Sequence, residues 1–293
     1  MKKAAYLLLC VLLAVVMLPM PARADMGPKP SVVVDFKGMA GERYYATLLS
    51  LKKSTGPFSA PRGGGDAYAR YHEGDEGYDV FLKFAGYQDA DGFYFLQYFQ
   101  DCTDTHRFTW TYYPPEEFKI LLYFPGEDRF AVSERLERYA FDSYFTADAS
   151  GLTLPDGGGL RVVKSYDYAA ETVSLIARIL LTIGIELLIA LLFRFREKKV
   201  FRFIAAVNVI TQGALNAALF AIDYSMGALA FLFGYVLLEI IVFVAEGILY
   251  AVFLKKRSEK KVPGWKAWVY ALTANAASFV LGVALSLWIP GLF

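Results

Sequence analysis

The stretch LIARILLTIGIELLIALLF, residues 175–193, decides the class of this protein. It is apolar except for one arginine, one threonine and one glutamate. A helix needs about 20 such residues to cross a hydrocarbon core of about 30 Å. The stretch therefore predicts a transmembrane helix, which we place at residues 172–193.

Three more stretches of this kind follow and are also long enough to cross a bilayer. They lie at residues 201–222, 226–254 and 267–289. The whole chain has 56% hydrophobic residues and a mean hydropathy of +0.36, which is too apolar for an ordinary soluble protein. Residues 169–293 are therefore predicted to form a four-helix transmembrane bundle. The lipid bilayer is the predicted partner of this bundle.

The charges between these stretches predict how the bundle is oriented. Residues 194–200 and 255–266, together with Arg202, hold 11 basic and 2 acidic side chains. Lys and Arg gather in the cytoplasmic loops of membrane proteins, so both loops are predicted to be cytoplasmic. The connection at residues 223–225 has no basic side chain and is predicted to lie outside, as is the C-terminus.

The first 24 residues have the three parts of a secretory signal peptide. Met1-Lys2-Lys3 precedes an apolar run, and Ala22-Arg23-Ala24 supplies a cleavage site of small residues. An uncleaved anchor helix is the alternative. The signal peptide and the loop charges predict the same topology independently, with residues 25–168 outside a bacterial cell membrane.

Residues 25–168 are predicted to form an extracytoplasmic β-rich domain. Short alternating runs, broken by Gly, Pro and Asp, are typical of strands and turns. The clearest run is 107–112, in which Phe108, Trp110 and Tyr112 share one face. Similar runs occur at 32–36, 44–51, 93–99, 118–124, 130–133 and 139–147. Seven short strands favour a sandwich-like domain.

One stretch of this domain has helical rather than strand spacing. In residues 75–87, one face is lined by Tyr78, Phe81, Leu82 and Ala85. We expect a short helix there that packs on the sheet or caps its edge. The fold class is thus an exported β domain with one short helix, followed by a membrane helix bundle.

The exported domain offers only weak candidates for chemistry. Its aromatic side chains are expected to form core rather than a ligand platform, since they alternate at strand spacing. Residues 89–92 (Asp-Ala-Asp-Gly) lack the further ligands of an EF-hand calcium loop and are expected to form a turn. His72 and His106 are far apart in sequence, and only His106 is near Cys102. We therefore predict no metal site, no cofactor and no catalytic residue here.

Polar side chains recur inside the four apolar stretches at matched depths. One layer, seven or eight residues from the predicted cytoplasmic ends, holds Glu186, Asn208, Glu246 and Asn275. A second layer, farther in, holds Arg178, Asn216 and Glu239, with Gln212 between the layers. Ionisable groups in a bilayer core cost at least ~2.5 to 3.5 kcal/mol each. We therefore expect these eight residues to face a shared interior as an intramembrane polar cluster.

The charges of this cluster allow three interpretations. Arg178 and Glu239 lie at matched depth and are expected to neutralise each other. Glu186 and Glu246 then have only carboxamide partners, and two close carboxylates in a low dielectric share a proton, take up protons or bind a cation. The residues therefore hold the bundle together, form a site for a proton, metal ion or cationic ligand, or form an interface with another membrane protein.

Four segments resemble a group of exported four-helix membrane proteins from Gram-positive bacteria that has no assigned function. They are residues 25–31 (DMGPKPS), 112–116 (YYPPE), 138–144 (RYAFDSY) and 174–178 (SLIAR). The resemblance spans nearly the whole chain. It implies a location in the bacterial cell membrane and no activity.

Two classes of function remain once enzymes and nucleic-acid binding are set aside. The membrane stretches contain no histidine, and residues 25–168 are acidic, with 22 acidic and 15 basic side chains. The first hypothesis is an extracytoplasmic binding or sensing protein that captures a cell-surface ligand and acts with a membrane partner. The second is a small transporter or ion-coupled protein that uses Glu186 and Glu246 and assembles with further copies of itself.

Overall fold

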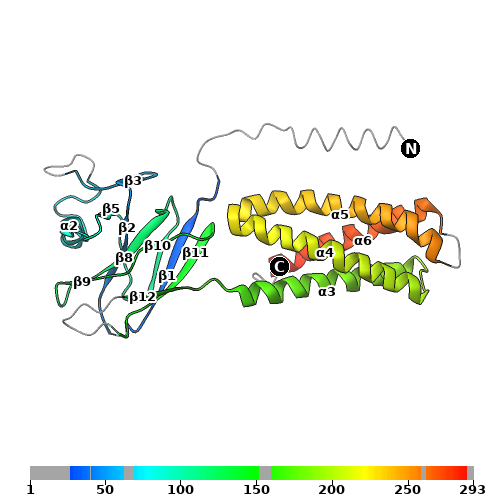
Figure 1. Cartoon of the computed structure of the whole chain (residues 1–293), viewed down its shortest axis with the longest axis horizontal. Helices are drawn as coiled ribbons and strands as arrows, with labels where there is room; N and C mark the ends of the chain where they lie inside the picture. The colour runs from blue at the N-terminus through cyan, green and yellow to red at the C-terminus, as the bar shows by residue number, and fades with distance from the viewer. Residues whose placement is uncertain (1–26, 40, 63–68, 152–159, 259–261, 289–293) are drawn as a thin grey trace.

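The computed structural model describes residues 27–39, 41–62, 69–151, 160–258 and 262–288. It has β sheets in the N-terminal part and four long helices that extend from one end of them (Figure 1). The predicted signal peptide, the glycine runs at 63–65 and 157–159, and the tail at 290–293 lie outside the described residues.

The strands form two larger sheets and one small hairpin. The first sheet has the order β12 (Arg161–Lys164), β11 (Asp142–Asp148), β1 (Ser31–Lys37) and β7 (Arg107–Trp110), with β1 parallel to β11 and antiparallel to β7. The second has the order β10 (Leu136–Glu137), β8 (Glu117–Phe124), β2 (Tyr45–Ser50) and β5 (Tyr94–Phe95). In the same sheet, β6 (Gln100–Asp101) pairs with β2 and β9 (Arg129–Val132) pairs with β8. The hairpin joins β3 (Ser54–Thr55) to β4 (Phe58–Ser59).

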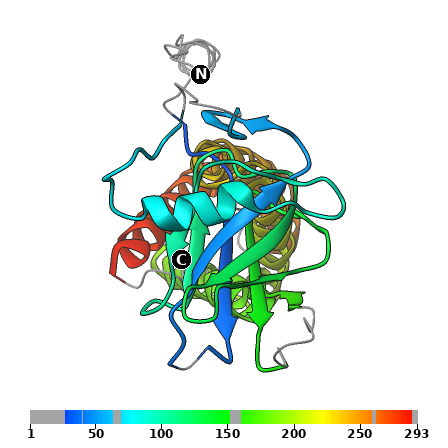
Figure 2. The same cartoon turned by 90° about the vertical axis from the view of Figure 1, so that its left-hand side faces the viewer.

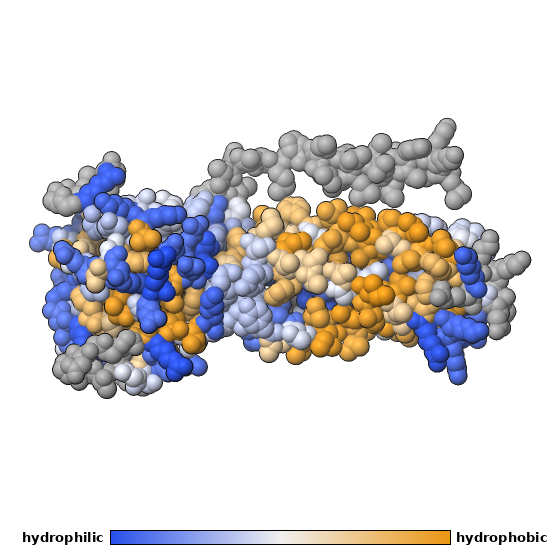
Figure 3. All heavy atoms as spheres, in the orientation of Figure 1, coloured by the Kyte–Doolittle hydropathy of each residue, from blue (hydrophilic) through white to orange (hydrophobic). Residues whose placement is uncertain are grey.

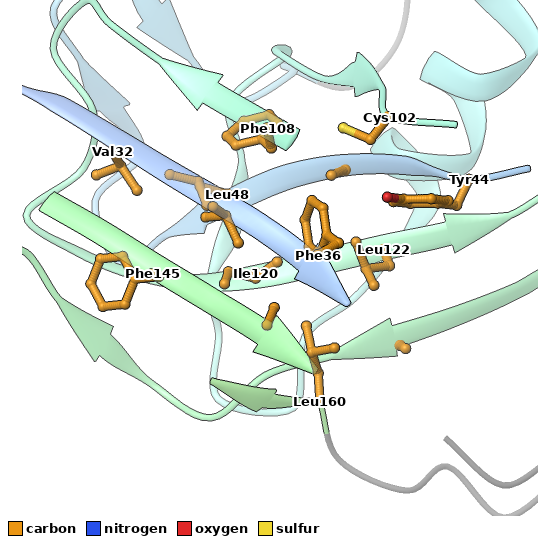
Figure 4. Close-up of a cluster of buried hydrophobic side chains, with 14 of the residues drawn as sticks. Val32, Phe36, Tyr44, Leu48, Cys102, Phe108, Ile120, Leu122, Phe145 and Leu160 are labelled. Atoms are coloured by element: carbon orange, nitrogen blue, oxygen red, sulfur yellow. The ribbon is translucent and has the colours of Figure 1, made fainter. Parts of the chain in front are cut away.

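One apolar core joins the two larger sheets (Figure 4). The first sheet contributes Phe108 and Phe145, and the second contributes Leu48 and Ile120, all of them buried. Phe108 and Trp110 are buried in this core and Tyr112 packs against it, which confirms the predicted alternation and the core role of these aromatics.

The other face of the second sheet is covered by helix α2 (Tyr78–Gly86), which lies across it in Figure 2. Phe81 and Phe84 pack there against Leu49 and Leu121. Strands β2 and β8 are thus covered on both faces, which explains their almost continuous burial. The helix is confirmed, but placing Leu82 on its packed face is wrong, because Leu82 is 49% exposed. The buried face of the helix instead runs through Phe81 and Phe84, which are three residues apart.

The turn at residues 89–92 holds an internal cation. Gly92 N–H donates to the Asp89 carbonyl at 3.1 Å, which confirms the predicted turn. The Lys119 ammonium, buried on β8, donates to Asp89 Oδ1 at 2.9 Å and to Asp91 Oδ2 at 2.5 Å. The acidic side chains of this turn therefore have a structural role, since they neutralise the buried Lys119.

Cys102 lies in the shared core and is expected to be chemically inert while the domain is folded. Burial raises the pKa of its thiol from 9.0 to about 12, so the thiolate fraction at pH 8 falls about a thousandfold. In the full chain carrying Cys10→Ala, iodoacetamide should leave Cys102 unmodified under native conditions. In urea, where the domain unfolds, it should modify Cys102 rapidly. Mass spectrometry measures this, and native modification would contradict the buried position.

The four helices are α3 (Tyr168–Leu192), α4 (Lys198–Met226), α5 (Ala228–Arg257) and α6 (Gly264–Trp288), and they overlap the four predicted spans. Each is long and apolar enough to cross a membrane, and the face of the bundle seen in Figure 3 is largely hydrophobic. They form a ring in which α3 and α5 each pack against α4 and α6. The chain is thus a multi-pass membrane protein by the length and composition of these helices.

One predicted boundary is wrong: residues 223–225 are helical, not a connection. Ser225 Oγ donates to the Ala221 carbonyl at 2.6 Å, and α4 continues to Met226. The turn to α5 is the single residue Gly227, with a φ of 80° that L side chains rarely adopt.

Candidate functional site

Four of the predicted polar residues meet in one buried cluster inside the bundle. Glu186, Asn208, Glu246 and Asn275 come from α3, α4, α5 and α6 respectively, and all are buried. Asn208 Nδ2 donates to Glu186 Oε2 at 2.7 Å, and Asn275 Nδ2 donates to Glu246 Oε2 at 2.8 Å. Each carboxyl group thus has an amide donor from a neighbouring helix. We call these four residues the glutamate cluster.

Three more side chains belong to this site and were missed by sequence reasoning. Thr211 Oγ1 donates to Glu246 Oε1 at 2.6 Å, and Asn208 Nδ2 also reaches the Tyr250 hydroxyl at 3.1 Å. Tyr270 donates to the Glu186 carbonyl at 3.2 Å. Spacing could have found two of them, because Thr211 follows Asn208 by three residues and Tyr250 follows Glu246 by four.

The cluster contains more acceptors than donors. The carboxyl groups of Glu186 and Glu246 lie within interacting range of each other. Glu186 Oε1, Asn208 Oδ1 and Asn275 Oδ1 are buried without a hydrogen-bond partner. A proton on one carboxyl group, or a bound cation, would satisfy such acceptors. The chemistry that this arrangement supports is therefore proton or cation binding.

The second predicted layer lines a cavity nearer the β domain. Arg178, Gln212, Asn216 and Glu239 all border this cavity of about 270 Å³. The structure does not form the expected pair of Arg178 with Glu239: in the described part of the chain, no ion pair joins them. Depth alone was misleading, because α3 and α5 face each other diagonally across the ring rather than packing together.

A second concave site lies in the β domain and was not predicted from the sequence. This cleft, of about 230 Å³, is bordered by Lys52, Tyr113, Glu116 and Arg138 among others. Arg138 Nε is buried without a hydrogen-bond partner. Burial lowers the pKa of Arg138, against the nearby charge of Glu116 that raises it. The guanidinium group is thus partly dehydrated at the edge of a cleft, which suits an anionic ligand group.

The β domain and the bundle meet at an aromatic junction. Phe141 N–H donates to the Tyr224 carbonyl at 2.8 Å, and Tyr224 packs against Tyr139 and Tyr166. At Gly227, any Cβ would overlap the Phe141 ring. The end of α4 and the turn to α5 therefore fit closely against the segment that leads into β11.

The histidines and Cys102 lie in separate surroundings. His72 is exposed beside Asp75, whereas the His106 ring stacks on Tyr44 and its Nδ1 lies 3.0 Å from the Tyr44 hydroxyl. Cys102 Sγ donates to the Gln100 carbonyl at 3.7 Å. Among the residues that the structure describes, no group of three His, Cys, Asp or Glu side chains has metal-binding geometry.

Comparison with known proteins gave no match of any kind. No family model matches the chain, and neither a curated protein nor a solved structure is significantly similar to it. The resemblance to exported four-helix proteins therefore stays a prediction.

Proposed function

We propose that this protein is a membrane-anchored sensor, exported by its signal peptide, whose sandwich-like β domain binds a ligand outside the cell membrane. The observation that carries the proposal is the segment 138–144. Arg138, at its start, borders the cleft, and Phe141, three residues later, contacts the turn between two membrane helices. A ligand that moves Arg138 would therefore also change the contact between Phe141 and Gly227.

The cleft suggests the chemistry of the ligand. Arg138 and Lys52 supply positive charge, Tyr113 supplies an aromatic face, and Ser54 and Thr55 supply hydroxyl groups. Lys52 is already paired with Glu116 at 3.2 Å, which leaves Arg138 as the main cation for a ligand. A carboxylate-bearing peptide or acidic sugar of the cell surface fits these groups, because guanidinium binds carboxylate in two-pronged geometry.

The connections from α3 to α4 and from α4 to α5 are too short to hold an output domain. Helices α3 and α4 are joined by residues 193–197 only, and α4 and α5 by Gly227 only. A signal that reaches the bundle is therefore passed to a second membrane protein or to another copy of this chain. The loops at 194–200 and 255–266 are assigned to the cytoplasmic side by their positive charge.

The proposal is tested by ligand binding to the full chain in lipid nanodiscs, against a panel of cell-wall peptides and acidic sugars. A bound ligand should slow amide exchange at Phe141 and around Gly227. Arg138→Gln should weaken binding about tenfold, since it removes a charged hydrogen bond. Arg43→Gln is the matched control, because Arg43 is exposed and borders no part of this cleft.

Gly227→Ala separates binding from coupling. The new Cβ would overlap Phe141 and force the turn away from the β domain, while the cleft itself is untouched. Ligand affinity should stay within about twofold of the parent, and the slowed exchange at Phe141 should be lost. The sensor proposal is abandoned if no ligand of the panel binds, or if binding leaves exchange at the junction unchanged in the parent.

A second candidate function is favoured by the glutamate cluster: an ion-coupled membrane protein that acts as an oligomer. Glu186 and Glu246 are both fully buried, they interact, and Glu186 Oε1 lacks a partner. Two carboxyl groups in such surroundings cannot both be ionised without a counter-charge. A purely structural cluster is the alternative, and the double glutamine variant described below distinguishes the two.

A further inference from the structure

The cavity in the half of the bundle nearer the β domain has the size of a small-molecule site. Its volume of about 270 Å³ is bordered by side chains from all four helices. At ~30 Å³ per molecule it would hold about nine waters. This volume is slightly smaller than the ~300–1,000 Å³ of pockets that bind drug-sized ligands. An occupant would therefore be a molecule of about the size of an amino acid.

Opposite charges stand on two helices that do not pack together. Arg178 is on α3 and Glu239 is on α5, and the Tyr235 hydroxyl lies within electrostatic range of both. Arg178 Nε is buried without a hydrogen-bond partner, and no salt bridge involves Arg178 in the described part of the chain. A charged group in the bilayer is expensive unless it is paired, and the nearby charge of Glu171, on the same helix as Arg178, offsets only part of this cost. An occupant with complementary charge would therefore stabilise the cavity.

A buried amide also faces this space. Gln212 borders the cavity and is only 3% exposed. The remaining wall is apolar and includes Leu215, Leu219 and Phe231. The cavity therefore combines a cation, an anion, an amide and an apolar wall, and the Tyr235 hydroxyl interacts with both charged groups.

We propose that this cavity binds a small zwitterion with an apolar body. Its anionic group contacts Arg178, its ammonium contacts Glu239 and Tyr235, and its apolar part packs on the leucine wall. Such chemistry has two sources: a free apolar amino acid, or the phosphoethanolamine headgroup of a membrane lipid. The site is separate from the cleft of the sensor proposal, so either can fail without the other.

The first test measures ligand binding to the full chain in a neutral maltoside detergent. L-Leucine should bind in calorimetry and raise the unfolding temperature. 4-Methylpentanoate lacks the ammonium and 3-methylbutylamine lacks the carboxylate, so each should bind about tenfold more weakly or less. Native mass spectrometry forms the second arm, with phosphatidylethanolamine compared with phosphatidylglycerol. Retention of phosphatidylethanolamine alone, without leucine binding, identifies the headgroup as the source.

Variants place the binding in the cavity. Arg178→Gln and Glu239→Gln should each weaken binding of the zwitterionic probe about tenfold. Arg202→Gln is the charge-matched control, because Arg202 is exposed near the other end of α4 and borders no part of the cavity. Gel filtration checks that each variant folds.

A cavity-filling variant keeps the proposal open to refutation if the charge variants do not fold. A Cβ at Gly282 would lie 3.4 Å from the Tyr235 hydroxyl oxygen, and Gly282→Leu therefore fills the space while leaving both charges in place. Binding should then be abolished. The proposal is overturned if neither leucine nor phosphatidylethanolamine binds the parent, if the single-charge analogues bind equally well, or if Gly282→Leu binds like the parent.

Discussion

Asp89→Ala is expected to lower the free energy of unfolding of the β domain by about 3–5 kcal/mol, because it leaves the buried Lys119 ammonium without its buried partner. The Asp89 side chain is 2% exposed and accepts from Lys119 Nζ through both oxygens, at 2.9 and 3.0 Å. It also accepts from the backbone N–H of Asp91 and Phe93. Alanine removes all of these bonds together.

Asp91→Ala is the matched control in the same turn. Asp91 also contacts Lys119 Nζ, but its side chain is 70% exposed, so its loss should cost at most about 1 kcal/mol. Urea unfolding of the full chain, followed by alkylation of Cys102, reports on the β domain alone, since Cys102 lies in its core. Equal effects of the two substitutions would contradict a buried ion pair at Asp89.

The same contact predicts how stability depends on pH. Burial lowers the pKa of the Lys119 ammonium, but its hydrogen bonds to Asp91 and Asp89 outweigh this and raise the pKa above 10.5. Because the pKa is raised in the folded state, the contribution of this ion pair to stability is complete at pH values below the pKa of an unfolded lysine. It is lost as the pH rises through the pKa of the folded state. The difference between parent and Asp89→Ala should therefore be constant near neutral pH and shrink in strongly alkaline solution.

Replacing Glu186 and Glu246 together by glutamine should reduce proton or cation uptake to background if the ion-coupled candidate is right. Glutamine has nearly the same shape as glutamate and retains a carbonyl oxygen for the amides of Asn208 and Asn275, so the bundle should still fold. It cannot ionise, and the site loses its charge. Uptake is measured in sealed vesicles with a pH-sensitive dye and with a panel of alkali-metal ions.

Glu171→Gln serves as the control for this experiment, because Glu171 lies in the first turn of α3, away from the glutamate cluster. Normal yield with lost uptake would support ion coupling. Equal uptake by the parent and the double variant would exclude a role for these carboxyl groups in transport. If neither protein takes up ions, the cluster is structural, and the double variant should then change stability rather than flux.

The sequence was a good guide to periodic elements and a poor guide to contacts between them. Strand β8 was predicted from the short run at residues 118–124, but that run says nothing of the two different neighbours of the strand. Ile120 faces the core between the sheets, whereas Leu121 faces helix α2. Leu82 was misplaced for the same reason, since periodicity defines a face only to within about one residue.

In the membrane half, depth could be predicted by counting residues along each helix. That count placed Glu186, Asn208, Glu246 and Asn275 at one level, and the structure brings them together. The same count paired Arg178 with Glu239, and the structure keeps them apart. Rise per residue gives position along a helix axis, but which helices are neighbours depends on how the four pack around the ring.

The amino-acid sequence by itself determined the apolar spans, the alternating strands and the levels of the polar side chains, because each follows from the short-range geometry of helix and strand. Only the tertiary structure decided that Arg138 borders a cleft, that Phe141 sits on Gly227 and that a cavity separates two opposite charges. These features join residues that are distant in sequence, and such contacts form through packing, which leaves no periodic signal in the chain.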